Sequence, residues 1–334
     1  MTKIALNGFG RIGRAVFKNI IEDYPELELV AVNDLADPDD LLHLLQNDTV
    51  YGSYEVTNEG GDLFAKGQRV KLFNKQNPEE LPWDELEVDI VLECTGVFRT
   101  YKGAKKHIEA GAKKVVISAP AKDPKKVPSF VMGVNEEEYD GQDIIDMGSC
   151  TTNALAPVVK ILNDNFGLKN GLMTTIHSYT VSQNILDGPG QKDLRRCRAA
   201  AENIVPTTTG AAKAIAKVIP EMEGRLDGMA VRVPTPTVSV VDLVCNLSQE
   251  VAVEEINNAF QEASKDPKMS KVFNTEEKPL VSSDYIQNPY SSIVDLEMTK
   301  VVGDSVKVLS WYDNEWGYAR RLVDFAKYVS NFEN

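Results

Sequence analysis

Histidine, cysteine and long apolar runs are all scarce in this chain of 334 residues. No apolar run approaches the roughly twenty residues of a membrane-spanning helix, and the N-terminus lacks the basic and apolar regions of a secretory signal. The four cysteines show neither metal-ligand pairs nor the spacing of a disulfide framework. We therefore expect a cytoplasmic protein of a reducing compartment that binds no metal and no membrane.

Positive charge is also in short supply, with 36 lysines and arginines against 50 aspartates and glutamates and a formal net charge of −14. This excess of negative charge disfavours nucleic acid and anionic membrane surfaces as partners. Any anionic ligand therefore needs a local basic site. The basic segment 192–198 and Arg232 are the candidates, because an unpaired guanidinium in the apolar strand around Arg232 would be costly.

A glycine-rich turn near the N-terminus has a strand before it and a helix after it. The apolar segment 3–7 runs into Gly8, Gly10 and Gly13, in the pattern G-x-G-x-x-G, and apolar residues then recur at helical spacing. Gly8 permits a tight turn, Gly10 lets the backbone approach a pyrophosphate, and Gly13 allows close packing of helix on strand. This pattern predicts a Rossmann-type dinucleotide site.

Asp34 follows the second expected strand, 27–32, about twenty residues beyond the glycines. A carboxylate there can accept hydrogen bonds from an adenosine ribose, and it would repel a 2′-phosphate. NAD is therefore favoured over NADP as the cofactor. An aspartate that merely caps a loop is the alternative interpretation.

Short strands alternate with helices over residues 1–149, which predicts a doubly wound parallel sheet. Further strands are expected at 88–93 and 114–118. Helices are expected at 39–45, with His43 on its surface or partly buried, and at 102–110. The second helix is rich in charge, so we expect His107 to be solvated.

Beyond residue 166 the chain changes to longer strands with two-residue alternation and fewer helices. The expected strands are 171–177, 229–233, 238–247 and 307–311, and the expected helices are 210–218, 253–264 and 318–332. The mixture predicts an α+β catalytic domain, 150–314, with a largely antiparallel sheet. The fold class is α/β, with an NAD-binding domain of residues 1–149 completed by the C-terminal segment 315–334.

The pentapeptide 149–153, Ser-Cys-Thr-Thr-Asn, opens a helical pattern over 154–166. At a strand-to-helix turn, free backbone N–H groups and the helix dipole favour a thiolate, so we expect Cys150 to have a lowered pKa and to be a nucleophile. The hydroxyls of Ser149 and Thr151 suit an anion beside the sulfur. A buried, inert cysteine in a capped helix explains the pentapeptide equally well.

Three blocks of this sequence resemble the phosphorylating glyceraldehyde-3-phosphate dehydrogenase family. They are 7–14, Asn-Gly-Phe-Gly-Arg-Ile-Gly-Arg; the pentapeptide 149–153; and 311–318, Trp-Tyr-Asp-Asn-Glu-Trp-Gly-Tyr. The resemblance implies NAD-dependent oxidation of glyceraldehyde 3-phosphate, with inorganic phosphate, to 1,3-bisphosphoglycerate in glycolysis and gluconeogenesis. It implies a thiohemiacetal and an acyl thioester on Cys150, and a homotetramer.

The resemblance also implies a role for individual residues. His177 would be the base beside Cys150, although a lone histidine at a strand end is more often structural. The incoming phosphate would be held by Ser149, Thr151, Thr209 and Gly210, and the substrate's own phosphate by Thr180, Ser182, Arg196 and Arg232. The cofactor would be held by Gly8, Gly10, Arg11, Ile12, Gly13, Asp34, Gln76, Thr95, Gly96, Ser118, Asn314 and Tyr318.

Two departures from the family pattern and two alternatives accompany this interpretation. Ala154 stands where many members carry a second cysteine, and Gln76 stands at a position that is often basic. The alternative enzyme is an erythrose-4-phosphate dehydrogenase, a relative that hydrolyses the thioester. The alternative from another class is a non-catalytic, nucleotide-responsive binding protein.

Overall fold

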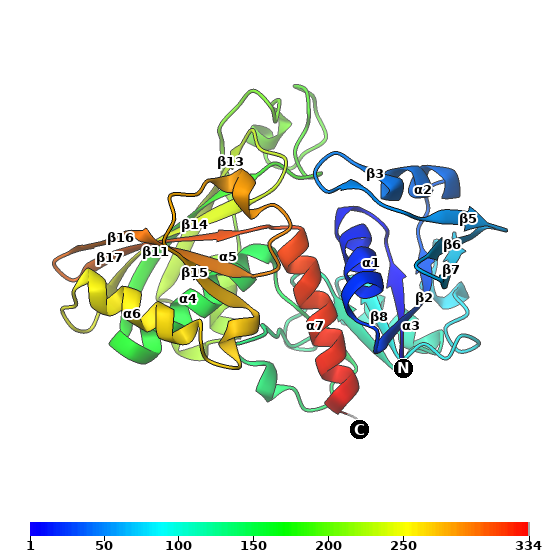
Figure 1. The fold of residues 1–334 in the computed structure, drawn as a ribbon, viewed down its shortest axis with the longest axis horizontal. Helices are drawn as coiled ribbons and strands as arrows, with labels where there is room; N and C mark the ends of the chain where they lie inside the picture. The colour runs from blue at the N-terminus through cyan, green and yellow to red at the C-terminus, as the bar shows by residue number, and fades with distance from the viewer. Residues whose placement is uncertain (333–334) are drawn as a thin grey trace. The chain divides into compact units, whose positions relative to one another are not determined.

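The computed structural model describes residues 1–332 and divides them into two compact units (Figure 1). Unit 1 contains residues 1–130, 137–149 and the described part of 318–334, and unit 2 contains residues 131–136 and 150–317. Residues 131–136 and 315–317, which the sequence assigns to the NAD-binding domain, group with unit 2. The domain limits stay a prediction, and the last two residues of the segment 315–334 lie outside the described residues.

Unit 1 is built on an eight-stranded sheet. Its strands in spatial order are β10 (Ile144–Asp146), β9 (Lys114–Ile117), β8 (Ile90–Glu93), β1 (Thr2–Asn7), β2 (Leu27–Asn33), β7 (Gln68–Phe73), β6 (Asp62–Ala65) and β5 (Thr57–Glu59). All neighbours from β10 to β7 are parallel, whereas β6 and β5 pair antiparallel. The chain winds outward from β1 in both directions, so the switch point where such sheets bind ligands lies between β1 and β8.

The helices of unit 1 come from both ends of the chain. They are α1 (Arg11–Asp23), α2 (Pro38–Gln46), α3 (Tyr101–Glu109) and the part of α7 (Trp316–Phe332) that belongs to this unit; β3 (Asn47–Asp48) and β4 (Gly52–Ser53) form a small separate ladder. Arg320 of α7 pairs with Asp23 at the end of α1, and its guanidinium carbon lies 4.5 Å from the ring centroid of Tyr24. The C-terminal helix is thus fastened to the first helix (Figure 1).

Unit 2 is built on a seven-stranded sheet. Its strands in spatial order are β12 (Val205–Thr208), β13 (Leu226–Val233), β11 (Leu168–Ser178), β14 (Ser239–Leu247), β17 (Ser305–Tyr312), β16 (Ser292–Val302) and β15 (Phe273–Glu276). Only the pairs β11–β13 and β15–β16 are parallel. The predicted α/β class with a largely antiparallel second sheet is confirmed, but β12, β15 and β16 were not predicted.

Helices cover one face of this second sheet (Figure 1). They are α4 (Cys150–Phe166), α5 (Ala211–Ala214) and α6 (Val253–Ala263). Side chains of β11 alternate accordingly: Met173 is buried in the core beneath the helices, whereas its neighbour Leu172 is 68% exposed on the other face. No helix within residues 1–332 is long and apolar enough to cross a membrane.

Candidate active site

Cys150 and His177 lie against one another in unit 2. Cys150 is the first residue of α4, and His177 stands near the end of β11. The Cys150 Sγ lies 3.6 Å from the His177 Nε2, and the Thr151 Oγ1 lies 4.0 Å from the same sulfur. The structure therefore brings a thiol within reach of an imidazole that can take its proton.

The ionisation of this pair differs from the sequence expectation. Cys150 retains some exposed surface, yet the protein packed around the sulfur raises its pKa, against the lowering effects of the Arg232 charge and of hydrogen bonds from Thr151 and the helix backbone. Burial, followed by the Arg232 charge, lowers the pKa of His177 to about 3. The expected lowering of the thiol pKa was wrong, because desolvation outweighs the Arg232 charge and the hydrogen bonds to the sulfur. At neutral pH both shifts favour the neutral forms, a thiol and a neutral imidazole.

Two tautomers of the neutral His177 ring fit its surroundings. The His177 Nδ1 lies 2.8 Å from the Ser178 carbonyl oxygen and 3.0 Å from the Arg232 NH1. If Nδ1–H donates to Ser178, Nε2 is free to accept the thiol proton. If Nδ1 instead accepts from Arg232, Nε2–H faces the sulfur as a donor. One ring can therefore both take a proton and return one, as acid–base catalysis requires.

Arg232 stands directly opposite His177 in the register of β13 and β11. Its NH1 donates to the Ser178 carbonyl oxygen at 2.7 Å and lies 3.4 Å from the Thr180 Oγ1, which in turn lies 3.0 Å from the Ser182 Oγ. Within residues 1–332, the buried Nε of Arg232 has no hydrogen-bond partner. A cation facing neutral acceptors is suited to an anion as its missing partner.

The other predicted anion ligands of unit 2 lie on its short elements. The Arg196 guanidinium is held against β12, with Nε donating to the Thr207 Oγ1 at 2.9 Å and NH2 donating to the Thr208 carbonyl oxygen at 3.1 Å. The Thr209 Oγ1 accepts a hydrogen bond from Ala211, and Gly210 directly precedes α5. Ser149 groups with unit 1.

Unit 1 holds a pocket of about 670 Å³ at the carboxyl ends of its central strands. The predicted cofactor residues Gly8, Gly10, Asp34, Gln76 and Thr95 line it. This is the switch point of the sheet, where a doubly wound fold binds its nucleotide.

The glycine turn fits a pyrophosphate. Gly8 has φ +98°, and a Cβ on it would lie 2.7 Å from the Thr95 backbone nitrogen. A Cβ on Gly13 would lie 2.1 Å from the Gly8 carbonyl oxygen, whereas one on Gly10 would meet nothing within 4 Å. Gly8 and Gly13 are therefore needed for packing, and the space before Gly10 is open to a ligand.

Asp34 is held at the rim of this pocket by the backbone. Its Oδ2 accepts a hydrogen bond from the Phe9 N–H at 2.6 Å and its Oδ1 accepts from Ala36 at 3.0 Å. Each oxygen keeps a further lone pair for a ribose hydroxyl. The acceptor oxygens of Asp34 and the open glycine turn together fit an adenine dinucleotide without a 2′-phosphate.

Comparison with known proteins agrees with this geometry. Residues 2–101 match the family model described as "Glyceraldehyde 3-phosphate dehydrogenase, NAD binding domain", and residues 149–314 match its "C-terminal domain". The chain is 52% identical over 333 residues to "Glyceraldehyde-3-phosphate dehydrogenase 1" of Bacillus subtilis, and 52% identical over 334 residues to "Glyceraldehyde-3-phosphate dehydrogenase" of Geobacillus stearothermophilus. Each alignment covers 98% of both chains. The chain belongs to the glyceraldehyde 3-phosphate dehydrogenase family. The predicted family and its NAD cofactor are confirmed.

Within this family member, several predicted cofactor residues are engaged by the protein itself. Arg11 forms an ion pair with Asp48, and its guanidinium carbon lies 5.2 Å from the Tyr51 ring centroid. The Thr95 hydroxyl donates to the Glu93 carboxylate and accepts from the Val97 N–H at 3.0 Å. The Thr95 backbone N–H also donates to the Glu93 Oε1, at 2.8 Å.

The remaining predicted cofactor residues have simpler surroundings. Ile12 lies in the first turn of α1, Gly96 has φ +71°, and the Ser118 N–H donates to the Glu93 carbonyl oxygen at 3.0 Å. In unit 1 the Tyr318 hydroxyl donates to the Gly148 carbonyl oxygen at 2.8 Å.

Asn314 in unit 2 is buried with a fixed amide orientation. Its Oδ1 accepts from the hydroxyls of Ser178 at 3.0 Å and Ser239 at 2.9 Å. With both lone pairs of the oxygen used, the amide nitrogen is the group left to meet a ligand.

Tyr312 is a site residue that the sequence reasoning missed. Its hydroxyl lies 2.9 Å from both the Thr151 Oγ1 and the Thr175 Oγ1, and its ring meets the His177 ring edge-on with centroids 6.1 Å apart. Tyr312 therefore helps to fix Thr151 and His177, the two residues that contact the Cys150 sulfur. A signal was available, because a tyrosine at a core-facing position of a strand needs a polar partner for its hydroxyl.

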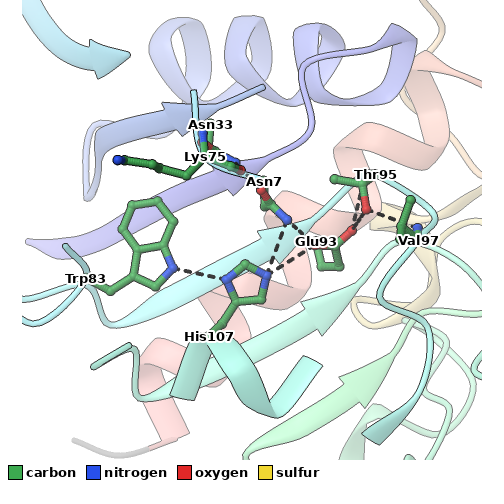
Figure 2. A network of polar contacts seen from close by, with 8 residues as sticks. All are labelled: Asn7, Asn33, Lys75, Trp83, Glu93, Thr95, Val97 and His107. Carbon is green, nitrogen blue, oxygen red and sulfur yellow. Dashed lines mark hydrogen bonds and ion pairs between the residues drawn. The ribbon is translucent and has the colours of Figure 1, made fainter. Parts of the chain in front are cut away.

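His107 was placed wrongly by the sequence reasoning. It is fully buried, with its Nδ1 accepting from the Trp83 Nε1–H at 3.0 Å and its Nε2 lying 3.2 Å from the Glu93 Oε2 (Figure 2). The charged residues of α3 occupy its outer side, while Ala104 and His107 share the inner side. The overall charge of α3 therefore does not predict whether His107 is buried.

Proposed function

We propose that this chain is an NAD-dependent, phosphorylating glyceraldehyde-3-phosphate dehydrogenase. It converts glyceraldehyde 3-phosphate and inorganic phosphate to 1,3-bisphosphoglycerate in glycolysis and gluconeogenesis. The observation that carries the proposal is the 3.6 Å approach of the Cys150 thiol to His177, with the Arg232 charge beside it, in a chain of this family. A protein that only binds a nucleotide needs neither group.

Cys150 is the nucleophile and His177 is its base. Because the pair is neutral, the thiol proton moves to the His177 Nε2 as the sulfur bonds to the aldehyde carbon, and the new oxyanion then takes that proton to give a thiohemiacetal. The bound NAD supplies the hydride acceptor for the oxidation. His177 accepts the hydroxyl proton of the thiohemiacetal as the carbonyl of the acyl thioester forms. Inorganic phosphate then attacks the thioester carbonyl carbon and the C–S bond breaks, so that the acyl phosphate leaves and the Cys150 sulfur takes back the proton held on His177.

Two sets of residues hold the two phosphates. Thr180, Ser182, Arg196 and Arg232 bind the phosphate of the substrate. Ser149, Thr151, Thr209 and Gly210 bind the incoming phosphate. Support for the first set is the buried Arg232 Nε, which has no hydrogen-bond partner among the described residues, and the 3.4 Å distance from the Arg232 NH1 to the Thr180 Oγ1. Support for the second is the position of Thr151 beside the sulfur.

NAD is held by the glycine turn and by residues around the pocket of unit 1. Gly8, Gly10, Arg11, Ile12 and Gly13 face the pyrophosphate, and Asp34 accepts from the ribose. The further cofactor ligands are Gln76, Thr95, Gly96, Ser118, Asn314 and Tyr318. The Asn314 amide N–H donates to the nicotinamide carboxamide, a role supported by the two hydroxyls that donate to the Asn314 oxygen.

The protein acts in the cytoplasm as a homotetramer, without nucleic acid or membrane partners. Support for self-association comes from the uncovered face of the second sheet, where Leu172, Met229 and Val244 expose apolar side chains. Apolar surface of this kind marks protein interfaces. Size-exclusion chromatography with light scattering tests the tetramer, and a monomer would refute it.

Formation of NADH from glyceraldehyde 3-phosphate and NAD, with and without inorganic phosphate, tests the proposed reaction. Strong phosphate-dependent turnover is expected. Turnover that does not need phosphate, and that is faster on erythrose 4-phosphate, would identify the hydrolysing relative instead. An inactive protein whose Cys150 still reacts with iodoacetamide would favour the nucleotide-binding alternative.

A further inference from the structure

Three neighbouring strands of unit 1 each end in a polar residue at the floor of the cofactor pocket. Asn33, Asn7 and Glu93 are the last residues of β2, β1 and β8, and the register pairs Asn7 with both of the others. All three are buried, Glu93 with no exposed surface at all. Together with His107 and Trp83 they form one connected network, which we call the polar belt (Figure 2).

The direction of every hydrogen bond in the first half of the belt is fixed by the backbone of Lys75. The Lys75 N–H donates to the Asn33 Oδ1 at 2.8 Å, and the Asn33 Nδ2 donates to the Lys75 carbonyl oxygen at 3.0 Å. The Asn33 Nδ2 also donates to the Asn7 Oδ1 at 2.7 Å, which leaves the Asn7 Nδ2 to donate to the Glu93 Oε2 at 2.5 Å. A flip of the Asn33 amide would break both backbone contacts, and a flip of the Asn7 amide would set its N–H group against that of Asn33.

The second half of the belt has its direction fixed by Trp83. An indole N–H can only donate, so the His107 Nδ1 must accept and its Nε2 must carry the hydrogen. That hydrogen is directed at the Glu93 Oε2. The 3.3 Å contact between the Asn7 Nδ2 and the His107 Nε2 joins two donors and is therefore no hydrogen bond.

Glu93 also holds the loop that follows β8. Its Oε1 accepts from the Thr95 N–H at 2.8 Å and from the Thr95 hydroxyl. With Asn7 and His107 on Oε2, donors surround both oxygens of one buried carboxylate. Only a group with two acceptor oxygens and no N–H satisfies them all.

We propose that Glu93 and His107 are positioning residues for the cofactor, and this rests on the proposed use of NAD. Glu93 joins the two backbone segments that meet at the switch point, the turn at Asn7–Gly8 and the loop at Cys94–Val97. These segments are so close that a Cβ on Gly8 would strike Thr95. The belt fixes their separation, and with it the width of the pocket that they line.

Fold stability alone does not explain a carboxylate at this place. Burying a charge is costly, and well-packed apolar residues often replace buried polar networks without loss of stability. What an apolar replacement cannot do is orient the Asn7 amide and the Thr95 backbone together. Rigid support of this kind is what binding groups need from the residues behind them.

Glu93→Gln is the decisive substitution, because a carboxamide of the same shape must turn one N–H against an existing donor. The matched control is Asp89→Asn. Asp89 lies at the opposite ends of the same strands, where its Oδ2 accepts from the Lys3 N–H at 2.8 Å and its Oδ1 accepts from the Lys113 Nζ at 2.8 Å. Both substitutions disturb hydrogen bonds between strands, but only Glu93→Gln lies at the pocket.

Calorimetric titration of the full-length protein with NAD measures the effect directly. We expect Glu93→Gln to raise the dissociation constant of NAD by about tenfold or more, with Asp89→Asn close to wild type. We also expect faster hydrogen exchange at the Thr95 and Val97 amides of Glu93→Gln without NAD. Its rate of Cys150 alkylation without NAD is expected to stay unchanged, since the contacts of that sulfur are with Thr151 and His177.

His107→Phe tests the same proposal if Glu93→Gln does not fold. A phenyl ring keeps the packing against Trp83 and Phe98, whose ring centroids lie 6.4 Å and 6.1 Å from that of His107, and removes only the nitrogens. Weaker NAD binding by the folded variant supports the proposal. Unchanged NAD binding by either folded variant, or an equal loss in Asp89→Asn, would overturn it. Failure of the wild-type protein to bind NAD would refute the proposed function instead.

Discussion

Arg232 and His177 face each other on neighbouring parallel strands, with the Arg232 NH1 3.0 Å from the His177 Nδ1. The guanidinium acts on both members of the reactive pair: its charge lowers the pKa of His177 and also lowers that of Cys150. The Arg232 charge thus favours the neutral form of His177 and the thiolate form of Cys150. A group proposed to bind the substrate phosphate therefore also sets the ionisation of the site.

Arg232→Gln is expected to shift the alkylation of Cys150 to higher pH. Burial already raises the pKa of Cys150, and removing the charge that opposes it raises that pKa further. Only the thiolate reacts, so the rate with iodoacetamide at neutral pH falls. The measurement is the alkylation rate against pH without cofactor. Arg195→Gln, which removes an exposed cation next to Arg196, is the control. Superimposable curves for Arg232→Gln and wild type would contradict the prediction.

Cys150→Ser is expected to lower turnover by more than about 10⁴-fold while NAD binding persists. A hydroxyl is a far weaker nucleophile than a thiol, and the predicted cofactor pocket belongs to unit 1. Steady-state rates and calorimetric titration with NAD measure the two effects. Cys197→Ser is the matched control, because Cys197 is also partly exposed but its Sγ contacts the Gln191 carbonyl oxygen, at 3.8 Å, in place of an imidazole. Comparable loss in both variants would remove Cys150 from the mechanism.

The parts of the fold that depend on neighbouring residues in sequence could be predicted, and those that depend on packing could not. The strand, glycine turn and helix around Gly8 are local, and they were expected where they lie. The burial of His107 depends on Trp83 and Glu93, which come from other elements. The raised pKa of Cys150 is likewise a sum over everything packed around the sulfur.

His177→Asn is expected to make the protein less sensitive to acid. The folded protein holds the pKa of His177 at about 3, whereas an unfolded histidine titrates near 6.5. Between these values the unfolded state binds the extra proton, so the free energy of unfolding falls as pH falls from about 6.5 towards 3. Asparagine removes that contribution. Urea midpoints at several pH values test this, with the exposed His43→Asn as control. An acid dependence in His177→Asn as steep as wild type would refute it.

Asp34→Asn is expected to shift cofactor preference from NAD towards NADP. The Asp34 carboxylate is fixed by the Phe9 and Ala36 N–H groups, and it opposes a 2′-phosphate through its charge. Asparagine keeps an acceptor oxygen but removes the charge, so the ratio of kcat/KM for NAD to that for NADP should fall by about tenfold. NAD itself should bind more weakly, because a ribose hydroxyl donates more strongly to a carboxylate than to an amide.

The control for this prediction is Asp37→Asn. Asp37 is a nearby carboxylate whose side chain caps α2 by accepting from the Asp39 N–H at 2.9 Å. If general negative charge near the pocket sets the preference, both variants gain NADP activity. If the fixed position of Asp34 sets it, only Asp34→Asn does, because a charge acts strongly only on a phosphate held within a few ångströms of it.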